Sequence, residues 1–237
     1  MLPDYASAQA LFSQYDLSVS RETYQKLEDY AVFLADYNEH VNLTAITDGD
    51  GILKKHFLDS LLLEAQCRAY LLEGGRLLDI GSGAGFPGVP LALVRPDLDI
   101  TLMDALNKRI VFLELLRDKL GLTYTAIHGR AEQLGRDGAY REQFDVVTAR
   151  AVAALPTLAE YSLPLVKVGG WWLAMKGPNE AVEPALAAIK TLGGKLAETL
   201  RTTLPDGEER AVYVVKKVAA TPTKYPRNSG QIKQKPL

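Results

Sequence analysis

Apolar and polar positions along residues 1–72 repeat with the period of an α-helix. Ser20 is a candidate N-cap, and after it come apolar residues spaced by three and four: Tyr24, Leu27, Tyr30, Ala31, Leu34 and Tyr37. A second set with this spacing runs over residues 52–64, and the polar stretch 42–49 between the two sets is typical of a loop. We therefore expect residues 1–72 to form a helical N-terminal extension.

From residue 73 onward, short apolar runs alternate with stretches of helical spacing. The runs are 76–80, 100–104, 124–127, 144–148 and 171–175, and the helical stretches lie near 88–94, 107–120, 154–167 and 179–192. This alternation is typical of a doubly wound parallel sheet that helices cover on both faces. Residues 195–218 contain two strand-like runs joined by Pro205-Asp-Gly-Glu, which predicts a terminal antiparallel hairpin. We expect one α/β domain over 73–218, with a seven-stranded, Rossmann-like sheet.

The end of the chain differs from the rest in composition. Residues 219–237 contain three prolines and few large apolar side chains, which predicts an extended tail. Residues 1–50 hold nine acidic and two basic side chains, whereas residues 211–237 hold six basic and no acidic ones. A basic tail can attract a polyanion, and it can equally be a solvated, frayed terminus, so both interpretations stay open.

Composition narrows the class of protein. The chain has 237 residues, 47% of them hydrophobic and 24% charged, and a net charge of −2, which is ordinary for a soluble domain. No apolar run reaches the roughly 18 residues of a membrane span, and the N-terminus lacks a signal-peptide pattern. The single Cys67 excludes an internal disulfide, and the scattered His40, His56 and His128 lack metal-ligand spacing. We expect a cytoplasmic protein without a metal, and nothing in the sequence demands more than a monomer.

The strongest local motif is a glycine-rich turn between an expected strand and an expected helix. It reads Leu77-Leu-Asp-Ile-Gly-Ser-Gly-Ala-Gly-Phe-Pro-Gly. Glycines let the backbone take positive φ and approach a ligand, and the following helix begins with unpaired N–H groups. Two or three glycines alone are weak evidence, because many strand-to-helix turns carry them for packing.

Two carboxylates sharpen the interpretation of this turn. Asp79 stands two residues before Gly81, where a carboxylate would repel the pyrophosphate of a dinucleotide and would attract an amino group or a sulfonium. Asp104 ends the next strand, at the place of a ribose-binding acid. Together they favour S-adenosylmethionine over NAD. Taken singly, Asp79 could be a turn acid and Asp104 a solvated acid at the end of a strand.

Several separated motifs resemble a known family. They are the glycine turn with its Phe86-Pro-Gly continuation, Asn42-Leu-Thr-Ala-Ile, His56-Phe-Leu-Asp-Ser-Leu, Arg95-Pro and Asp104-Ala-Leu-Asn-Lys-Arg. By their sequences and their order along the chain, these motifs resemble the bacterial 16S ribosomal RNA guanine-N7 methyltransferases, the RsmG or GidB family, over about residues 20–218. The ending from Thr221 to Leu237 is also similar to the basic ending of some members. The resemblance implies a class I S-adenosylmethionine-dependent methyltransferase fold with a helical N-terminal extension. It further implies methyl transfer to N7 of one guanine in the decoding-region loop of 16S ribosomal RNA.

The resemblance also implies a set of cofactor-binding residues. Asp104 corresponds to the ribose acid, Ala131 and Glu132 to the pair that flanks adenine, and Arg150 to a positioning residue near cofactor or target. The full set is Asp79, Gly81, Gly83, Gly85, Phe86, Asp104, Ala131, Glu132 and Arg150. Without the resemblance, Glu132 would be a solvated helix-start acid, Arg150 a surface ion-pair partner and Phe86 a core residue.

The residues after the fourth expected strand restrict the chemistry. That turn reads Thr148-Ala-Arg-Ala, not the Asn/Asp-Pro-Pro-aromatic turn usual for methylation of exocyclic base nitrogens. Cys67 lies in apolar company in the helical extension, so a cysteine nucleophile for carbon-5 methylation is disfavoured. Guanine N7 has a free lone pair and no proton, so its methylation needs positioning and no general base.

Candidate RNA contacts are the basic residues near the carboxyl ends of strands and in the tail. They are Lys108, Arg109 and Lys176 at the strand ends, with Lys224 and Arg227 in the tail. Solvation on a helix surface explains Lys108 equally well. His56, Asp59 and Ser60 share one helical face, which is compatible with local hydrogen bonding alone.

Three other functions stay open from the residues. The chain could be a ribosome-assembly or RNA-binding factor that keeps a cofactor pocket without turnover. It could be a small-molecule methyltransferase, because the fold would permit one. An NAD-dependent oxidoreductase is disfavoured by Asp79 and by the glycine spacing.

Overall fold

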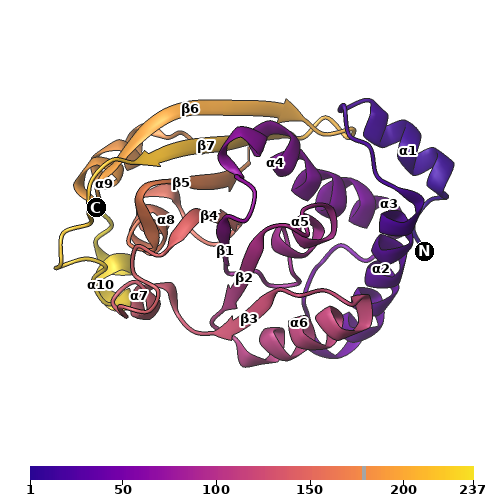
Figure 1. Cartoon of the computed structure of the whole chain (residues 1–237), viewed down its shortest axis with the longest axis horizontal. Helices are drawn as coiled ribbons and strands as arrows, with labels where there is room; N and C mark the ends of the chain where they lie inside the picture. Colours follow the sequence, from indigo (N-terminus) through magenta and orange to yellow (C-terminus); the bar gives the residue numbers. More distant parts are fainter. Residues whose placement is uncertain (178–179) are drawn as a thin grey trace.

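The computed structural model describes residues 1–177 and 180–237 and has a seven-stranded sheet at its centre (Figure 1). The strands are β1 Arg76–Ile80, β2 Asp99–Asp104, β3 Thr125–His128, β4 Phe144–Arg150, β5 Val166–Lys176, β6 Gly194–Thr203 and β7 Glu209–Lys217. Their order is β3-β2-β1-β4-β5-β7-β6, with β1 to β5 parallel and β7 antiparallel to both of its neighbours. The predicted parallel sheet with a terminal hairpin is confirmed.

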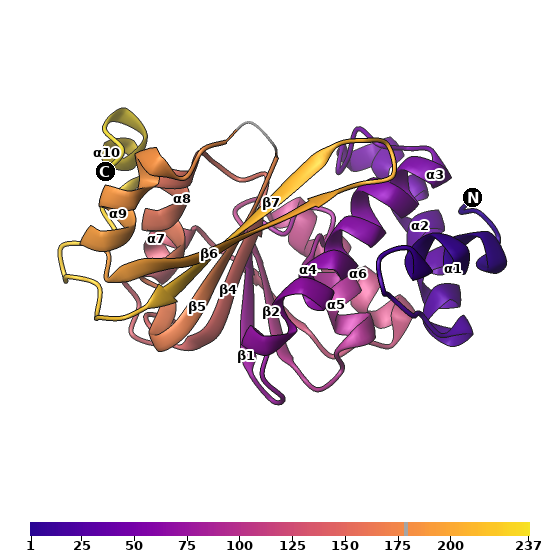
Figure 2. The same cartoon turned by 90° about the horizontal axis from the view of Figure 1, so that it is seen from above.

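Helices cover both faces of this sheet (Figure 2). On one side lie α1 Tyr5–Ser13, α2 Arg21–Val41, α3 Gly49–Gly51, the π-helix η1 Ile52–Leu58, α4 Asp59–Cys67, the 3₁₀-helix η2 Arg68–Tyr70, α5 Gly88–Val94 and α6 Asn107–Leu120. On the other side lie α7 Ala131–Leu134, α8 Leu155–Ser162, η3 Glu183–Ala185, α9 Leu186–Thr191 and α10 Ser229–Gln234. No helix within the described ranges is both long and apolar enough to cross a membrane.

Alternating side chains of the strands fill the two cores. Leu77 of β1 packs with the N-terminal helices, and its neighbour Leu78 packs with the helices on the opposite face. Val214 and Val215 of β7 divide in the same way. Because successive side chains of a strand point to opposite faces, a strand buried on both sides is apolar throughout, as the sequence pattern indicated.

The N-terminal helices share the core of the sheet domain. The Ser20 side chain accepts a hydrogen bond from the Thr23 backbone N–H, so the predicted N-cap of α2 is confirmed. Tyr30, on the buried face of α2, donates from its hydroxyl to the Ala84 carbonyl in the glycine turn. The helical region and the glycine turn therefore hold each other in place.

One boundary differs from the sequence pattern. Strand β5 begins at Val166 and α8 ends at Ser162, whereas the helical spacing predicted a helix that continued to residue 167. Val166 pairs with Phe144 across the sheet, while residues 167–169 are exposed. The pairing with β4 fixes this strand start, and nothing in the local spacing reveals it.

The prediction of an extended tail over 219–237 is wrong. Thr221, Tyr225 and Ile232 are buried, and residues 229–234 form α10. In Figure 2 this segment lies beside α7, α8 and α9. Tyr225 and Ile232 pack into the core on this face of the sheet, and the Thr221 hydroxyl donates to the Leu192 carbonyl. The composition of the segment does not reveal these contacts.

Candidate active site

The glycine turn folds tightly against the end of β2. The backbone N–H groups of Gly81 and Ser82 both donate to the Met103 carbonyl, at 2.7 and 3.0 Å. Gly81, Gly83 and Gly85 have φ of 67°, 59° and 100°, a region that side chains disfavour. A Cβ on Gly85 would also lie 2.7 Å from the Tyr30 hydroxyl oxygen. The three glycines are therefore required by the backbone path of the turn.

Asp79 is fully buried beneath the turn. Its Oδ2 accepts a hydrogen bond from the Gly88 backbone N–H at 3.1 Å, at the start of α5. Its Oδ1 has no hydrogen-bond partner among the residues that the structure describes. Burial raises the pKa of this carboxyl to about 8, and the Gly88 N–H and the nearby Ser82 hydroxyl lower it only in part. A buried carboxylate oxygen without a donor is a place for a donor from a ligand.

Asp104 ends β2 and tightens the same turn from the other side. Its Oδ2 accepts from the Gly83 backbone N–H at 3.0 Å and from the Arg109 guanidinium at 3.1 Å. Its Oδ1 accepts from the Leu106 N–H at 2.9 Å. The carboxylate is thus fixed in direction at the mouth of a cavity.

This cavity, the cofactor cavity, has a volume of about 200 Å³. It is lined by the ends of β1 and β2, by the segment that begins α7, by α8 and by α10: Ile80, Gly81, Met103, Asp104, Ala105, Gly129, Arg130, Ala131, Glu132, Val152, Tyr161 and Lys233. Asp104, Ala131 and Glu132, three of the residues predicted to bind the cofactor, lie here together. Carboxyl ends of parallel strands at this position form the usual ligand crevice of open α/β sheets.

Phe86 connects the turn to the N-terminal helices. Its ring stacks on Tyr30 at 5.3 Å and on the His56 imidazole at 4.4 Å between centroids. The Arg150 guanidinium lies 5.1 Å from the centre of the same ring. Phe86 is 4% exposed and does not line the cofactor cavity. Side chains from three separate segments of the chain therefore pack on this ring.

Arg150 is held by residues 55–59, where the π-helix η1 continues into α4. Its guanidinium donates to the Lys55 carbonyl and to Asp59 Oδ2, each at 2.9 Å, and lies 3.1 Å from His56 Nδ1. His56 Nδ1 also lies 3.1 Å from the Lys55 carbonyl, and Nε2 lies 2.9 Å from the Thr44 hydroxyl. Burial and the Arg150 charge lower the pKa of His56 to about 3. His56 is therefore neutral near pH 7, and both of its ring nitrogens have partners.

Beside Arg150 lies a larger cavity of about 490 Å³, the acceptor cavity. Its walls come from three parts of the chain: Ile46, Lys55, His56 and Asp59 before the sheet, Arg150, Ala151, Met175, Lys176, Gly177 and Glu180 after β4 and β5, and Glu208 and Arg210 from the hairpin. Lys55 pairs with Glu208, and Arg210 pairs with Glu208 at 2.8 Å and with Asp59 at 3.5 Å. The hairpin and the N-terminal helices thus meet across this cavity.

The two cavities lie on either side of the short segment after β4. Arg150 and Ala151 line the acceptor cavity, and the next residue, Val152, lines the cofactor cavity. Val152 also covers the glycine turn, since its Cγ2 would lie 2.7 Å from a Cβ on Gly81. Two consecutive residues, Ala151 and Val152, therefore border different cavities.

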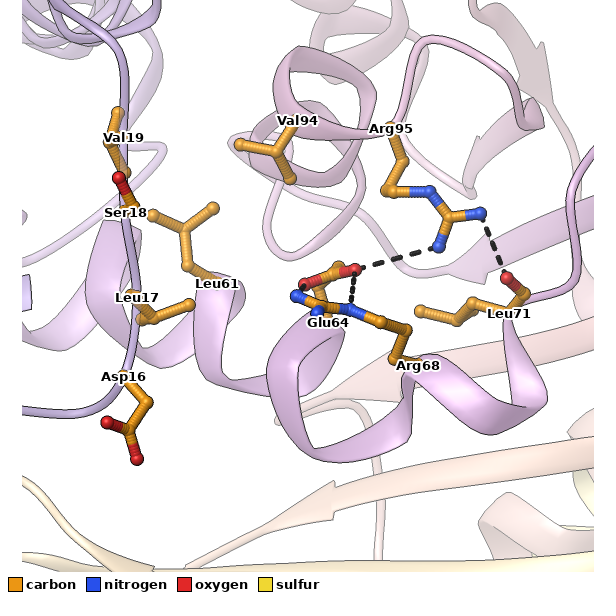
Figure 3. Close-up of a pocket in the computed structure, with 10 residues that line it drawn as sticks. All are labelled: Asp16, Leu17, Ser18, Val19, Leu61, Glu64, Arg68, Leu71, Val94 and Arg95. Carbon is orange, nitrogen blue, oxygen red and sulfur yellow. Dashed lines mark hydrogen bonds and ion pairs between the residues drawn. The ribbon is translucent and has the colours of Figure 1, made fainter.

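A third cavity, of about 440 Å³, lies between the loop after α1, helix α4 and the end of α5 (Figure 3). Figure 3 shows Glu64 between two arginines. It bonds Arg68 at 2.9 Å and lies 3.6 Å from Arg95 Nη1. Arg95 also binds the Leu71 carbonyl and Asp97, so the charges of this pocket satisfy one another.

Comparison with known proteins places the chain in a family. The GidB family model, described as rRNA small subunit methyltransferase G, matches residues 23–202. A ribosomal RNA small subunit methyltransferase G of Lactobacillus delbrueckii subsp. bulgaricus is 47% identical over 229 residues, 95% of this chain and 96% of that protein. One from Alkaliphilus metalliredigens is 46% identical over 218 residues, 90% of each chain. The chain belongs to the GidB family.

Solved structures agree with the family on the fold. TrmN from Thermus thermophilus matches with a TM-score of 0.50 and 20% sequence identity, over 70% of this chain and 53% of that protein. The chain thus spans about half the length of TrmN, and at this identity the likeness shows the fold alone. The predicted class I methyltransferase fold with a helical N-terminal region is confirmed.

As a GidB-family member, the chain is a methyltransferase that uses S-adenosylmethionine. The residues present fit this cofactor. Asp79 offers a buried carboxyl oxygen to which no described residue donates, and an amino group is such a donor. Asp104 and Glu132 place further carboxylates around a cavity that holds polar and apolar walls, as an adenosine moiety requires.

The basic residues predicted to face RNA are not equivalent. Lys108 is exposed at the start of α6. Arg109 bonds Asp104, and the Lys176 ammonium lies against the Ala153 carbonyl and bonds Glu180 at 2.8 Å. Arg227 binds Glu160 through its guanidinium and its backbone N–H. Lys108 and Lys224 are exposed and have no ion-pair partner in the described part of the chain, and Lys224 lies 5.2 Å from the centre of the Tyr225 ring. The other three have acidic partners.

Several residues of the two cavities were not predicted. Val152, Tyr161 and Lys233 line the cofactor cavity, and Lys55 and Arg210 line the acceptor cavity. The motif His56-Phe-Leu-Asp-Ser-Leu indicated the helical segment that carries Lys55. The others come from a loop, a helix middle, a hairpin and the C-terminal segment, which no local motif marks.

Proposed function

We propose that this protein transfers a methyl group from S-adenosylmethionine to N7 of a guanine in the decoding-region loop of 16S ribosomal RNA. The partner is 16S RNA or the small ribosomal subunit, and the protein acts as a cytoplasmic monomer. The observation that carries the proposal is the adjacency of the two cavities across residues 150–152. The family of the chain supplies the substrate class.

For the cofactor side, we assign binding to residues on the glycine turn and the strand ends. Asp104 accepts from the ribose, Ala131 and Glu132 flank the adenine, and Asp79 faces the amino group. Gly81, Gly83 and Gly85 keep side chains out of the path of the ligand. S-adenosylmethionine, when bound, supplies an electrophilic methyl group on a sulfonium.

For the acceptor side, Arg150 is the positioning residue. Its guanidinium is fixed by two acceptors, by the neighbouring His56 ring and by the Phe86 ring, so it enters the reaction already oriented. A planar cation in this place can stack on a base or donate to guanine O6, which lies beside N7. Phe86 acts through Arg150 and His56, since its own ring is covered.

The side chains of the acceptor cavity fit a reaction without proton transfer. His56 is neutral and uses both ring nitrogens, and Asp59 is paired with Arg150. Guanine N7 has a lone pair and carries no proton, so its methylation requires alignment and exclusion of water alone. Methylation of an amino group or a hydroxyl would leave a proton to remove, for which these groups are poorly placed.

The deciding experiment is methyl transfer from labelled S-adenosylmethionine to unmodified 16S RNA and to small subunits, followed by nucleoside mass analysis. We expect label in 7-methylguanosine. Label in a different nucleoside would refute the assigned acceptor atom while leaving the cofactor assignment intact.

A second candidate is an RNA-binding assembly factor that binds the cofactor without turnover. It predicts stoichiometric RNA binding, binding of S-adenosylhomocysteine and no methylated product on RNA or on subunits. The complete set of glycines and the adjacent cavities favour the enzyme.

A further inference from the structure

Residues 219–237 are anchored to the sheet domain by hydrogen bonds to half-buried and buried groups. The Thr221 backbone N–H donates to Glu142 Oε1 at 2.7 Å, and its hydroxyl donates to the Leu192 carbonyl at 2.8 Å. Arg141 donates to the Thr221 carbonyl at 2.7 Å and to the Tyr225 carbonyl at 2.8 Å. A frayed terminus would leave its backbone to water, and here the backbone has fixed protein partners.

A second anchor lies deeper. Glu160 of α8 is 0% exposed, and its carboxylate accepts from the Arg227 backbone N–H at 2.7 Å and from its guanidinium at 2.6 and 2.9 Å. Removal of one partner from such a buried pair leaves an uncompensated charge. The position of Glu160 inside the domain therefore depends on the C-terminal segment lying over it.

Beyond this anchor, the chain reaches the cofactor cavity. Ile232 is 0% exposed in the core on this face of the sheet, and the next residue, Lys233, lines the cavity together with Asp104 and Glu132. Tyr161, which follows Glu160 on α8, lines the same cavity. Neighbouring residues of one helix thus hold the C-terminal segment and border the ligand space.

We propose that residues 222–237 form the outer wall of the cofactor site and that Lys233 is a cofactor-binding residue. This inference rests on the proposed function, in that the cavity takes the adenosine end of S-adenosylmethionine. The methylenes of Lys233 cover one side of the ligand, and its ammonium donates to a ring nitrogen or a ribose oxygen. The segment therefore contributes to cofactor affinity. Two of its four basic residues are assigned away from RNA, because Arg227 is paired with Glu160 and the exposed Lys233 lines the cavity.

Removal of the wall tests the proposal. A chain that ends at Thr221 keeps the bonds of Thr221 to Glu142 and Leu192. We expect it to bind S-adenosylhomocysteine at least tenfold more weakly than the full chain by titration calorimetry. Far-ultraviolet circular dichroism and a cooperative thermal transition show whether the truncated chain is folded.

Lys233→Ala tests the same point without removing an anchor, and Lys235→Ala is its control on the same terminal segment. We expect Lys233→Ala to weaken S-adenosylhomocysteine binding about three- to tenfold, which is the loss of one hydrogen bond and some contact. Lys235 is exposed and lies outside the cavity lining, so its variant should match the full chain. Equal affinity of Lys233→Ala and Lys235→Ala would overturn the assignment of Lys233.

Proteolysis gives a readout in the unaltered protein. Trypsin cuts after Arg227 and Lys233 only when the segment undocks, so a ligand that binds the docked form should protect both bonds. We expect saturating S-adenosylhomocysteine to slow these two cleavages severalfold. Cleavage at an unchanged rate would refute the proposal.

The outcomes separate this inference from the proposed function. A full chain that binds no S-adenosylhomocysteine would contradict the cofactor assignment itself. A full chain and a truncated chain that bind it equally would overturn the wall alone. Unchanged cofactor binding with weaker RNA binding and a smaller salt dependence would show that the segment is an RNA-binding arm, which also refutes the wall.

Discussion

Helix α4 and the residues around it carry two similar charge clusters, one near each end of the helix. At its start, Asp59 is bonded by Arg150 at 2.9 Å and approached by Arg210 at 3.5 Å. Further along, Glu64 is bonded by Arg68 at 2.9 Å and approached by Arg95 at 3.6 Å. Both carboxylates are buried, and each cluster borders a cavity of several hundred cubic ångströms.

The two clusters differ in what else the central arginine touches. Arg150 ends β4 at the carboxyl edge of the sheet, lies on the Phe86 ring of the glycine turn and is two residues from the wall of the cofactor cavity. Arg95 follows α5 at the opposite edge and binds the Leu71 carbonyl and Asp97. A buried carboxylate held by two arginines is therefore not in itself a mark of an active site. What distinguishes the two clusters is their position relative to the carboxyl ends of the parallel strands.

The largest contrast is expected from the two arginines. Arg150→Lys keeps the charge and loses the planar fork that contacts three groups of residues 55–59 at once. We expect kcat/KM for methyl transfer to fall about 100-fold, because misplacement of the acceptor is costly at the reacting distance. Arg95→Lys should leave kcat/KM within about twofold and should lower the thermal midpoint instead. Comparable losses of methyl transfer in both variants would refute the distinction.

Two aspartates give the next contrast, measured as affinity for S-adenosylhomocysteine. Asp104→Asn weakens the acceptor for the Gly83 N–H and for a ribose hydroxyl, so we expect a loss of about 30-fold, as for a hydrogen bond to a charged group. Asp97 pairs with Arg95 at the other edge, and Asp97→Asn should bind as the unaltered protein does. Calorimetric titration of the two variants under one buffer condition checks this.

A third prediction concerns pH and Asp79 in the protein without cofactor. Its folded pKa of about 8 lies above the unfolded value of about 3.9, so the folded state holds a proton that the unfolded state has lost. The stabilising contribution is complete below about pH 4 and disappears as the pH rises through 8. Unfolding in urea should therefore show stability falling with pH from 5 to 8, at most about tenfold in the unfolding constant per pH unit.

Asp79→Asn should lose this slope, so the difference in stability between the unaltered protein and the variant should change with pH from 5 to 8. Asp97→Asn is the control, because hydrogen bonds from Arg95 lower the pKa of Asp97 and it stays ionised throughout that range. A slope that persists in Asp79→Asn would show that a different group titrates.

The smallest effect is expected at the exposed surface. Lys108 lies beside the cofactor edge, and Lys195 begins β6 at the opposite edge of the sheet. Lys108→Ala should weaken 16S RNA binding about threefold and reduce the salt slope by about one, as for the loss of one phosphate contact. Lys195→Ala should change neither, and a loss equal to that of Lys108→Ala would show that RNA binding is not confined to the cofactor edge.

The helices, the strands and the glycine turn follow from the sequence, because their signals are local. The period of the apolar residues distinguishes helix from strand, and the glycines, Asp79 and Asp104 lie within or directly after predicted strands. Carboxyl ends of parallel strands meet at one edge of a sheet, so the neighbourhood of Asp79, Asp104 and Arg150 could be inferred before any coordinates. The family motifs added the roles.

Tertiary structure alone decided which charged groups form ion pairs within the protein. Arg150 meets Asp59 across 91 residues of sequence, and Arg227 meets Glu160 across 67. Such pairs leave no periodic trace, because the energy of a buried ion pair depends on distance and desolvation and not on spacing along the chain. For the same reason the composition of residues 219–237 predicted an extended tail, and the buried partners on α8 folded it over the cofactor cavity.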